Sequence, residues 1–377
     1  MEPLKALVVD DTIVYRKIVG DVLSAIPGIK VVGTANNGKI AMSKIKTLKP
    51  DIITLDIEMP EMNGLDVLKR LIDEAPDIKT IMVSTLTREG GEMTIKALEL
   101  GAFDFIPKPL EGTMKENTDK IFEALVPIVK VLKRKFEIKS ILQGRRAGNK
   151  PPVAVKERKK SPLVRSRPDD IIERMKKLTK RTVSKRSEIV TIGISTGGPN
   201  ALAKMMPCLP GDIGVPILIV QHMPPIFTQS LAKSLDAKCA IKVKEAAEGD
   251  VIEPNVAFIA PGGKQMKIVA GTDGLTRKIK ITDDPPENSC KPSVDYLFRS
   301  VASHYVGRST GVIMTGMGSD GTRGLADIKE NGGVVIAQNE ETCTVFGMPK
   351  DPIEKKIADI IAPLDQIASE ITKTVKK

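Results

Sequence analysis

The sequence is poor in aromatic residues and contains no tryptophan. Aromatic residues make up 3% of the 377 positions, with eight Phe and three Tyr. Any hydrophobic core must therefore be built mainly from Ile, Val, Leu, Met and Ala, within a composition that is 41% hydrophobic. A chain of this length and composition is long enough for two ordinary globular domains, each with its own core.

Cysteine is also scarce, and its spacing excludes common structural roles. The four cysteines, Cys208, Cys239, Cys290 and Cys343, form no C-x-x-C motif and have no metal-ligand spacing with histidine. Dispersed thiols are typical of a reducing compartment. The chain shows no signal peptide and no apolar run near the ~20 residues that a transmembrane helix needs. We therefore expect a cytoplasmic protein without membrane insertion.

The net charge of +11 does not predict nucleic-acid binding, because the charge is concentrated in one segment. Residues 145–186 carry sixteen Lys and Arg against four Asp and Glu, so the rest of the chain is close to neutral. Prolines punctuate this basic region, and we predict a flexible linker over 134–187, with a short helix at 169–180. Attraction of the linker to an acidic partner is the alternative interpretation. A DNA-binding transcription factor is disfavoured, because the folded parts are neutral.

Residues 1–133 alternate short apolar strands with amphipathic helices. Five strands and five helices in this order predict a doubly wound parallel sheet. The expected strands are 6–9, 29–35, 52–55, 80–83 and 103–106. Ligands of such sheets bind at the carboxyl ends of the strands.

Polar residues follow four of these strands. Asp10 and Asp11 end the first strand, Asp56 ends the third, Ser84 ends the fourth and Lys108 follows the fifth. Three neighbouring carboxylates repel one another unless a cation neutralises them, and Mg²⁺ suits a few carboxylates with water and a phosphate. The alternative role, in which each Asp merely caps the next helix, does not account for all five positions.

These residues resemble the receiver domain of bacterial two-component response regulators. The matching residues are Asp10-Asp11, 55–60 (LDIEMP), Gly64, Ser84 and Lys108-Pro109. The resemblance implies that a sensor histidine kinase supplies a phosphoryl group to Asp56. It also implies that the metal site consists of Asp10, Asp11, Asp56 and the backbone carbonyl of Glu58. Ser84 and Lys108 would support the phosphoryl group, Phe105 would be a switch aromatic residue, and the Lys108–Pro109 peptide would be cis.

The region 188–377 also alternates strands and helices, and it begins with a chemically informative turn. A strand at 188–194 enters the turn Gly193-Ile-Ser195-Thr-Gly197, and a helix follows. A serine at such a strand–turn–helix junction is exposed at the sheet edge, beside free N–H groups that can stabilise an oxyanion. The alternative is a solvent-facing serine in a glycine-rich turn, and the stretch alone does not separate the two. Strands at 256–260, 265–269 and 275–281 predict antiparallel hairpins inserted into a mostly parallel α/β domain.

A serine nucleophile needs a base, and the chain contains two histidines. His222 follows a strand, as Ser195 does, whereas His304 lies in the last turn of a predicted helix, where it can serve the helix dipole. Asp320 follows a third strand and can orient His222. The sequence therefore predicts a Ser195–His222–Asp320 triad, in an order that differs from that of the α/β-hydrolases.

The turn at Asp320 also allows a different interpretation. Gly316, Gly318 and Gly321 fit the G-x-G-x-x-G pattern of dinucleotide-binding sites, and Glu340 lies at the distance of a ribose-binding acid. A carboxylate at Asp320 would face the pyrophosphate, which argues against this oxidoreductase alternative. Stabilisation by NAD(P) would distinguish the two.

Four motifs of this region, preceded by a receiver, resemble the chemotaxis response-regulator protein-glutamate methylesterases. The motifs are 193–198 (GISTGG), 221–224 (QHMP), 292–295 (PSVD) and 315–321 (TGMGSDG). The resemblance implies hydrolysis of glutamate γ-methyl esters and deamidation of glutamines on methyl-accepting chemotaxis receptors, with no cofactor for the ester chemistry. Backbone N–H groups of Thr196 and Met317 would bind the oxyanion.

We also expect steric regulation, and the sequence departs from some relatives of this family at one motif. We expect the unphosphorylated receiver (1–133) to cover the cleft at Ser195 in the catalytic domain (188–377), and phosphorylation of Asp56 to favour an uncovered state. Some relatives have His-Arg before the 292–295 motif, where this chain has Cys290-Lys291. The difference leaves the triad intact and affects the substrate contacts around it.

Overall fold

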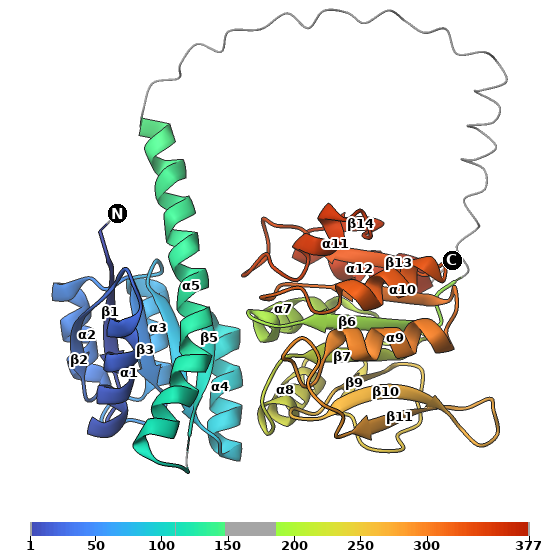
Figure 1. Ribbon diagram of the computed structural model, residues 1–377, viewed down its shortest axis with the longest axis horizontal. Coiled ribbons are helices and arrows are strands. Elements are labelled where there is room, and N and C mark those ends of the chain that lie inside the picture. The colour runs from blue at the N-terminus through green and yellow to red at the C-terminus, as the bar shows by residue number, and fades with distance from the viewer. Residues whose placement is uncertain (1, 110, 148–185, 376–377) are drawn as a thin grey trace, which may run out of the picture.

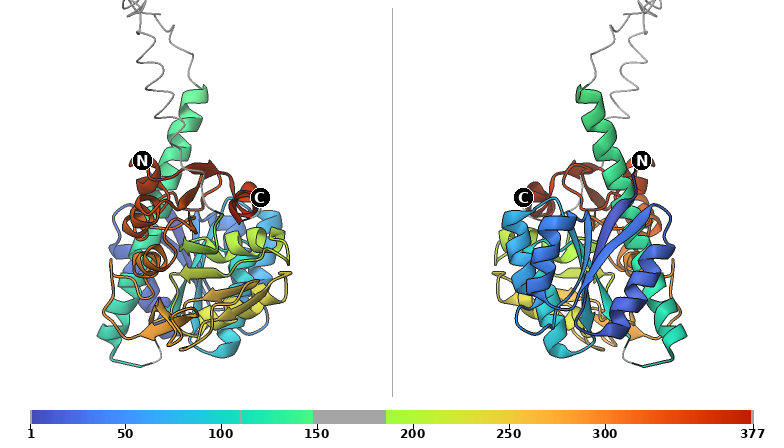
Figure 2. Two further views of the ribbon diagram at one scale, coloured as in Figure 1. Left: turned by 90° about the vertical axis from the view of Figure 1, so that its right-hand side faces the viewer. Right: turned by 90° about the vertical axis from the view of Figure 1, so that its left-hand side faces the viewer.

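The computed structural model describes residues 2–109, 111–147 and 186–375, which form two α/β domains that lie side by side (Figure 1). Figure 2 views the molecule from either end, so that one domain covers the other. Most of the predicted linker, including the helix expected at 169–180, lies outside the described residues. Within the described part, no helix has both the length and the apolar character required to cross a membrane.

The N-terminal domain is the predicted doubly wound sheet. Its strands are parallel and lie in the order β2-β1-β3-β4-β5. The strands are β1 (Leu4–Val9), β2 (Ile29–Ala35), β3 (Ile52–Asp56), β4 (Lys79–Thr85) and β5 (Asp104–Lys108). The helices are α1 (Ile13–Ala25), α2 (Gly38–Leu48), α3 (Gly64–Glu74), α4 (Arg88–Leu100) and α5 (Met114–Ala147). Helices α1 and α5 cover one face, and α2, α3 and α4 cover the other.

The apolar strand residues explain why helices cover both faces of this sheet. Successive side chains of a strand point to opposite faces. In β1, Leu7 and Val9 belong to the core under α2–α4, whereas Ala6 and Val8 belong to the core under α1 and α5. All five residues of β3, the central strand, are buried.

Two features of this domain differ from expectation. Helix α5 continues past residue 133 to Ala147, because 134–143 contains no Gly or Pro to end it. The Lys108–Pro109 peptide is not cis, and the one cis bond in the described chain is Lys291–Pro292.

The C-terminal domain contains a seven-stranded parallel sheet in the order β14-β13-β12-β6-β7-β9-β8. Its strands are β6 (Ile189–Ile194), β7 (Ile217–Gln221), β8 (Lys242–Glu245), β9 (Val256–Ile259), β12 (Ser309–Ile313), β13 (Val334–Gln338) and β14 (Ile360–Ala362). The inserted antiparallel hairpin consists of β10 (Gln265–Ala270) and β11 (Arg277–Thr282). The strand expected at 256–260 pairs with the parallel sheet, not with the hairpin.

Helices cover both faces of this second sheet too. Its helices are α7 (Gly198–Met205), α8 (Phe227–Asp236), α9 (Val294–His304), α10 (Thr322–Glu330), α11 (Lys350–Glu354) and α12 (Leu364–Val375), with a 3₁₀ turn at Met206–Cys208. Helices α7, α8 and α12 pack on one face, and α9, α10, α11 and the hairpin pack on the other. The first face lies against α4 of the N-terminal domain, which contacts α7 and α8 (Figure 1).

Candidate functional site

The three predicted triad residues follow three adjacent strands of the seven-stranded sheet. Strand β6 lies between β7 and β12, and Ser195, His222 and Asp320 follow β6, β7 and β12 respectively. Because these strands are parallel, their carboxyl ends meet at one edge of the sheet. The topology therefore brings residues that are far apart in sequence to one place.

The turn that carries Ser195 is held by close packing and backbone hydrogen bonds. The Ser195 N–H donates to the Thr315 carbonyl, and the Ser195 carbonyl accepts from the Gly198 N–H. Gly197 has φ +77°, and a Cβ added there would lie 2.4 Å from the Thr344 side chain. The glycine is therefore required both by the left-handed backbone and by the space available.

Asp320 is almost completely buried and accepts an unusual number of hydrogen bonds. His222 Nε2 lies 2.9 Å from its Oδ2, and the Val294 N–H donates to the same oxygen at 2.7 Å. Its Oδ1 accepts from Ser293 Oγ and Asn288 Nδ2. Burial alone would raise the pKa of Asp320, but these hydrogen bonds and the charge of His222 lower it to about 2. Asp320 is thus a carboxylate held in one orientation beside the imidazole.

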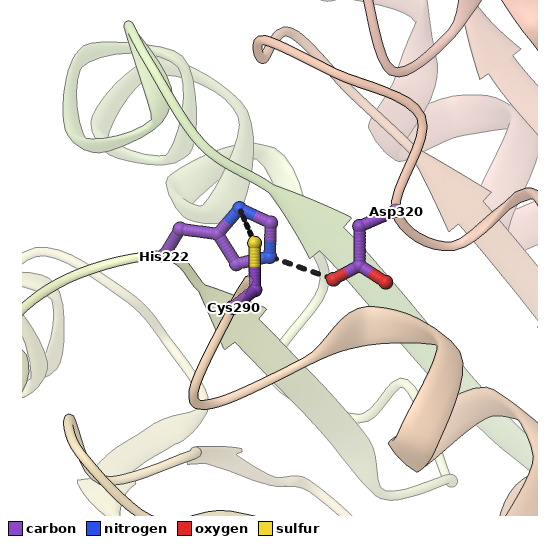
Figure 3. A group of neighbouring side chains, drawn as sticks. All are labelled: His222, Cys290 and Asp320. Carbon is purple, nitrogen blue, oxygen red and sulfur yellow. Dashed lines mark hydrogen bonds and ion pairs between the residues drawn. The ribbon is translucent and has the colours of Figure 1, made fainter. Parts of the chain in front are cut away.

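His222 has a different contact on each ring nitrogen. Nε2 faces Asp320, and Nδ1 lies 3.7 Å from the Cys290 Sγ (Figure 3). Burial lowers the pKa of His222, but the hydrogen bonds with Asp320 and Cys290 outweigh it and raise the pKa to about 9. In this arrangement the imidazole is held in its protonated form at neutral pH.

Ser195 lies in the same cavity as His222, without a hydrogen bond between their side chains. The cavity has a volume of about 200 Å³ and is lined by Ser195, Thr196 and His222 among others. Within the described chain, the Ser195 hydroxyl makes no hydrogen bond, nor do the N–H groups of Thr196 and Met317. Since Nε2 is bound to Asp320, Nδ1 is the ring nitrogen that remains for Ser195.

The other histidine lies away from this group. His304 is in the last turn of α9, whereas Ser293 and Val294, which bond to Asp320, lie at the opposite end of that helix. Burial lowers the pKa of His304, so the side chain is held mainly neutral. Asn288 and Cys290 also approach the site, from the loop between β11 and α9, and no motif predicts a role for Asn288 in orienting Asp320.

The acidic residues of the N-terminal domain also come together. Lys108 Nζ lies 2.8 Å from Asp10 Oδ2 and 2.8 Å from Asp56 Oδ2. Oxygens of Asp10, Asp11 and Asp56 all lie within 4.8 Å of one another. Burial raises the pKa of Asp56 to about 7 and also raises that of Asp10, because one lysine does not neutralise three carboxylates. An oxygen-rich cluster with this excess of negative charge fits Mg²⁺.

Two of the three remaining predicted residues, Ser84 and Phe105, contact groups other than the carboxylate cluster. The Ser84 hydroxyl donates to the Gly90 carbonyl in the first turn of α4 and accepts from the Thr94 hydroxyl at 2.7 Å. The Glu58 side chain is exposed. Phe105 faces the C-terminal domain, where its ring centroid lies 4.4 Å from that of Phe227.

Polar contacts reinforce this interface between the domains. Glu99, near the end of α4, accepts from Ser234 Oγ at 2.6 Å and pairs with Lys238 Nζ at 2.6 Å. The Asn200 amide donates to the backbone carbonyls of Leu98 and Glu99. The C-terminal end of α4 is thereby attached to α7 and α8.

The N-terminal domain forms one wall of the cavity at Ser195. Leu98, Asp104, Phe105 and Pro107 line it opposite the serine. Burial raises the pKa of Asp104 to about 6, although hydrogen bonds from the Phe105 N–H and the Thr196 hydroxyl oppose the shift. The N-terminal domain thus contacts Thr196, the residue next to Ser195.

Comparison with known proteins identifies both domains. Residues 6–117 match the model of the response regulator receiver domain, and residues 190–371 match that of CheB methylesterase. The chain is 55% identical over its full length to the protein-glutamate methylesterase/protein-glutamine glutaminase of Desulfotalea psychrophila, and covers all of that protein. It is 44% identical to the protein of the same name from Bacillus subtilis, with 99% of each chain covered.

A solved structure is similar to the second domain. The Thermotoga maritima CheB methylesterase catalytic domain is 41% identical, with a TM-score of 0.48, over 50% of this chain and 98% of that chain. The 55% identity to the Desulfotalea psychrophila protein, in contrast, extends over the full length and so through both domains. The chain therefore belongs to the CheB methylesterase family, and it is a hydrolase that carries a response regulator receiver domain.

Proposed function

We propose that this protein hydrolyses glutamate γ-methyl esters of chemotaxis receptors, and deamidates receptor glutamines, through Ser195, His222 and Asp320. The observation that carries the proposal is that His222, whose Nε2 lies 2.9 Å from Asp320 Oδ2, lines the same cavity as Ser195. The names of the relatives supply the substrate class. A cytoplasmic location is part of the proposal, supported by four dispersed free cysteines, which are typical of a reducing compartment.

The geometry supports a covalent mechanism. Ser195 Oγ attacks the γ-carbonyl carbon while neutral His222 takes its proton, and the N–H groups of Thr196 and Met317 bind the oxyanion. Collapse breaks the bond to the leaving group, which takes the proton from His222 and departs as methanol or ammonia. Water then cleaves the acyl-enzyme by the same steps and restores Ser195. Asp320 keeps the imidazole oriented and stabilises the imidazolium.

Asp56 is the proposed phosphoacceptor, with a sensor histidine kinase as the donor. Asp10, Asp11 and Asp56 would hold Mg²⁺ together with the backbone carbonyl of Glu58, and the ion would offset the charge of the phosphoryl group. Lys108 already contacts Asp56 and can pair with a phosphoryl oxygen. Ser84 is placed to donate a second hydrogen bond once its hydroxyl turns away from Gly90.

Release of Ser84 from α4 offers a route from phosphorylation to activity. Helix α4 carries the contacts that place the receiver over the cavity, including those of Glu99. A Ser84 hydroxyl that donates to the phosphoryl group would no longer donate to the Gly90 carbonyl, which weakens the docked position of α4. We assign residues 1–133 to the receiver, 134–187 to the linker and 188–377 to the catalytic domain.

The test is methanol release from methylated receptor membranes, with and without a small phosphodonor and Mg²⁺. We expect release that increases with the phosphodonor, disappears in Ser195→Ala and loses its stimulation in Asp56→Asn. Release from Ser195→Ala at the wild-type rate would disprove the assignment of the nucleophile. Stimulation that persists in Asp56→Asn would disprove the assignment of the phosphoacceptor.

A further inference from the structure

Cys290 lies in the candidate active site without a part in the proposed hydrolysis. One atom each of His222, Cys290 and Asp320 lie within 4.8 Å of one another, and Figure 3 shows the Cys290 sulfur over the imidazole ring with the Asp320 carboxylate beside the ring. Cys290 is partly buried and is one of four free cysteines. A nitrogen, a sulfur and an oxygen so close together form a set of metal-binding donors.

The separation between Cys290 and His222 matches that of two ligands on one ion. Zn²⁺ binds thiolate sulfur at about 2.3 Å and imidazole nitrogen at about 2.0 Å, so tetrahedral angles place the two ligands about 3.5 Å apart. The distance from Cys290 Sγ to His222 Nδ1 is 3.7 Å. The distance therefore suits two ligands of one ion, and binding requires the thiol to turn so that the sulfur and the Nδ1 lone pair meet at one position.

The other side of the imidazole has the partner that a metal-bound histidine requires. Asp320 Oδ2 lies 2.9 Å from Nε2, which leaves Nδ1, 3.7 Å from the thiol, as the nitrogen available to an ion. A carboxylate on the second ring nitrogen fixes the tautomer and increases the basicity of the ligating nitrogen. Four donors besides His222 hold this carboxylate, including the buried Val294 N–H and Ser293 Oγ, so its position is set before any ion binds.

We propose that Cys290 and His222 bind Zn²⁺ or another thiophilic divalent cation, and that this cation inhibits the hydrolase. Binding requires a Cys290 thiolate and neutral His222, so it releases protons to solvent. With an ion on Nδ1, the imidazole has no free nitrogen to accept the Ser195 proton. The metal site stands independently of the proposed reaction, whereas the inhibition rests on it.

The site is chemically distinct from the receiver cluster. Asp10, Asp11 and Asp56 offer oxygens alone, which suit Mg²⁺, whereas a thiolate with an imidazole selects Zn²⁺ and related ions. Mg²⁺ should therefore not compete at Cys290. The two sites can be separated by the choice of ion and by the Asp56→Asn variant.

Direct binding is tested with Co²⁺ on the full-length chain, because cobalt thiolates absorb in the near ultraviolet. We expect this absorption in the wild type and in Asp56→Asn, and its loss in Cys290→Ser and Cys290→Ala. The matched control is Cys208→Ser, which changes an exposed free thiol. Absorption that is absent from the wild type, or that persists in folded Cys290→Ser and Cys290→Ala, would overturn the proposal.

Inhibition is measured as the Zn²⁺ concentration that halves methanol release, with each variant normalised to its own metal-free rate. We expect Cys290→Ala to require at least about tenfold more Zn²⁺, a loss typical of removing even an outer partner of a metal site. A chelator should restore activity, and Mg²⁺ should not inhibit. Equal sensitivity of wild type and Cys290→Ala would overturn the inhibitory role. If methanol release failed altogether, the cobalt absorption would still decide the metal site.

Discussion

Asn288 connects two buried carboxylates at the active site. Its Nδ2 donates to Asp320 Oδ1 at 2.8 Å and to Asp295 Oδ2 at 3.0 Å. Its backbone has φ +53°, and the neighbouring Ser289 has φ +63°. Burial raises the pKa of Asp295, so the amide separates Asp320 from a carboxyl group that is difficult to ionise. Asn288 is therefore a positioning residue, which acts through Asp320.

This predicts a loss of activity in Asn288→Gly, which removes the amide and keeps a residue suited to positive φ. A hydrogen bond to a charged group contributes about 1.5–3 kcal/mol, so kcat/KM should fall by about tenfold or more. Ser289→Gly is the matched control, since it changes the adjacent left-handed residue outside this network. Equal kcat/KM values for the two variants in methanol-release assays would contradict the role of Asn288.

The pKa of His222 predicts an alkaline pH dependence. General-base catalysis requires neutral imidazole, and the hydrogen bonds with Asp320 and Cys290 raise the pKa of His222 to about 9. The value of kcat/KM for the unphosphorylated protein should therefore rise with pH and level off above about 9. Asp320→Asn should move this rise to lower pH while reducing the maximum rate. A wild-type profile that levels off near the ordinary histidine pKa would contradict the prediction.

At the scale of elements, the turn between β6 and α7 depends on Gly197. In Gly197→Ala, the new methyl group meets Thr344 and the residue keeps an unfavourable φ, so we expect lower thermal stability and loss of activity. Gly274→Ala is the control, because Gly274 has φ +69° but open space around it. Gly274→Ala should cost only about 1–2 kcal/mol of backbone strain. Thermal unfolding and methanol release are measured for both variants. Equal losses in Gly197→Ala and Gly274→Ala would exclude the clash with Thr344 as the cause.

The contacts of α4 give a prediction for regulation. Glu99→Ala removes the hydrogen bond from Ser234 and the ion pair with Lys238. If docking of α4 keeps the cavity covered, activity without a phosphodonor should rise by up to about tenfold, because a partly exposed charged pair contributes no more than the lower limit of about 1.5–3 kcal/mol for a charged hydrogen bond. Glu89→Ala, at an exposed position of the same helix, is the control. Unchanged basal activity in Glu99→Ala would contradict the covering role of this contact.

The sequence predicts the site better than it predicts the surroundings of the site. Strict alternation of strands and helices places Ser195, His222 and Asp320 at neighbouring strand ends, so their proximity follows from topology. Asn288 and Cys290 lie in a loop without periodicity, and no pattern there indicates which side chains turn inward. The short edge strands β8 and β14 were missed because few residues carry their signal.

At the scale of the molecule, the contact between domains could not be predicted from the sequence. Helix α4 has the amphipathic pattern of any helix that covers a sheet, and nothing in it distinguishes Glu99 from a solvated charge. The pairing of Phe105 with Phe227 depends on the relative placement of two separately folded sheets. Such placement is set by many weak contacts, none of which has a sequence signature.

The connection between the domains gives a prediction at this scale. A protease site introduced into 148–185 would convert docking from an intramolecular into a bimolecular equilibrium, so the receiver should dissociate on dilution. Methanol release per catalytic domain should then increase as the cleaved protein is diluted, whereas that of the uncut protein should stay constant. Concentration-independent activity after complete cleavage would show that the receiver does not limit access to Ser195.

One buried apolar cluster runs without interruption through both domains, from Ile95 and Leu98 to Leu202 and Leu231. Protein unfolding is cooperative where a core is shared, so the docked molecule should melt in a single calorimetric transition. Separation of the domains divides that core and exposes part of it to water. Phosphorylation would then activate the hydrolase and also lower its melting temperature. An enzyme of this design would therefore be least stable in its active state.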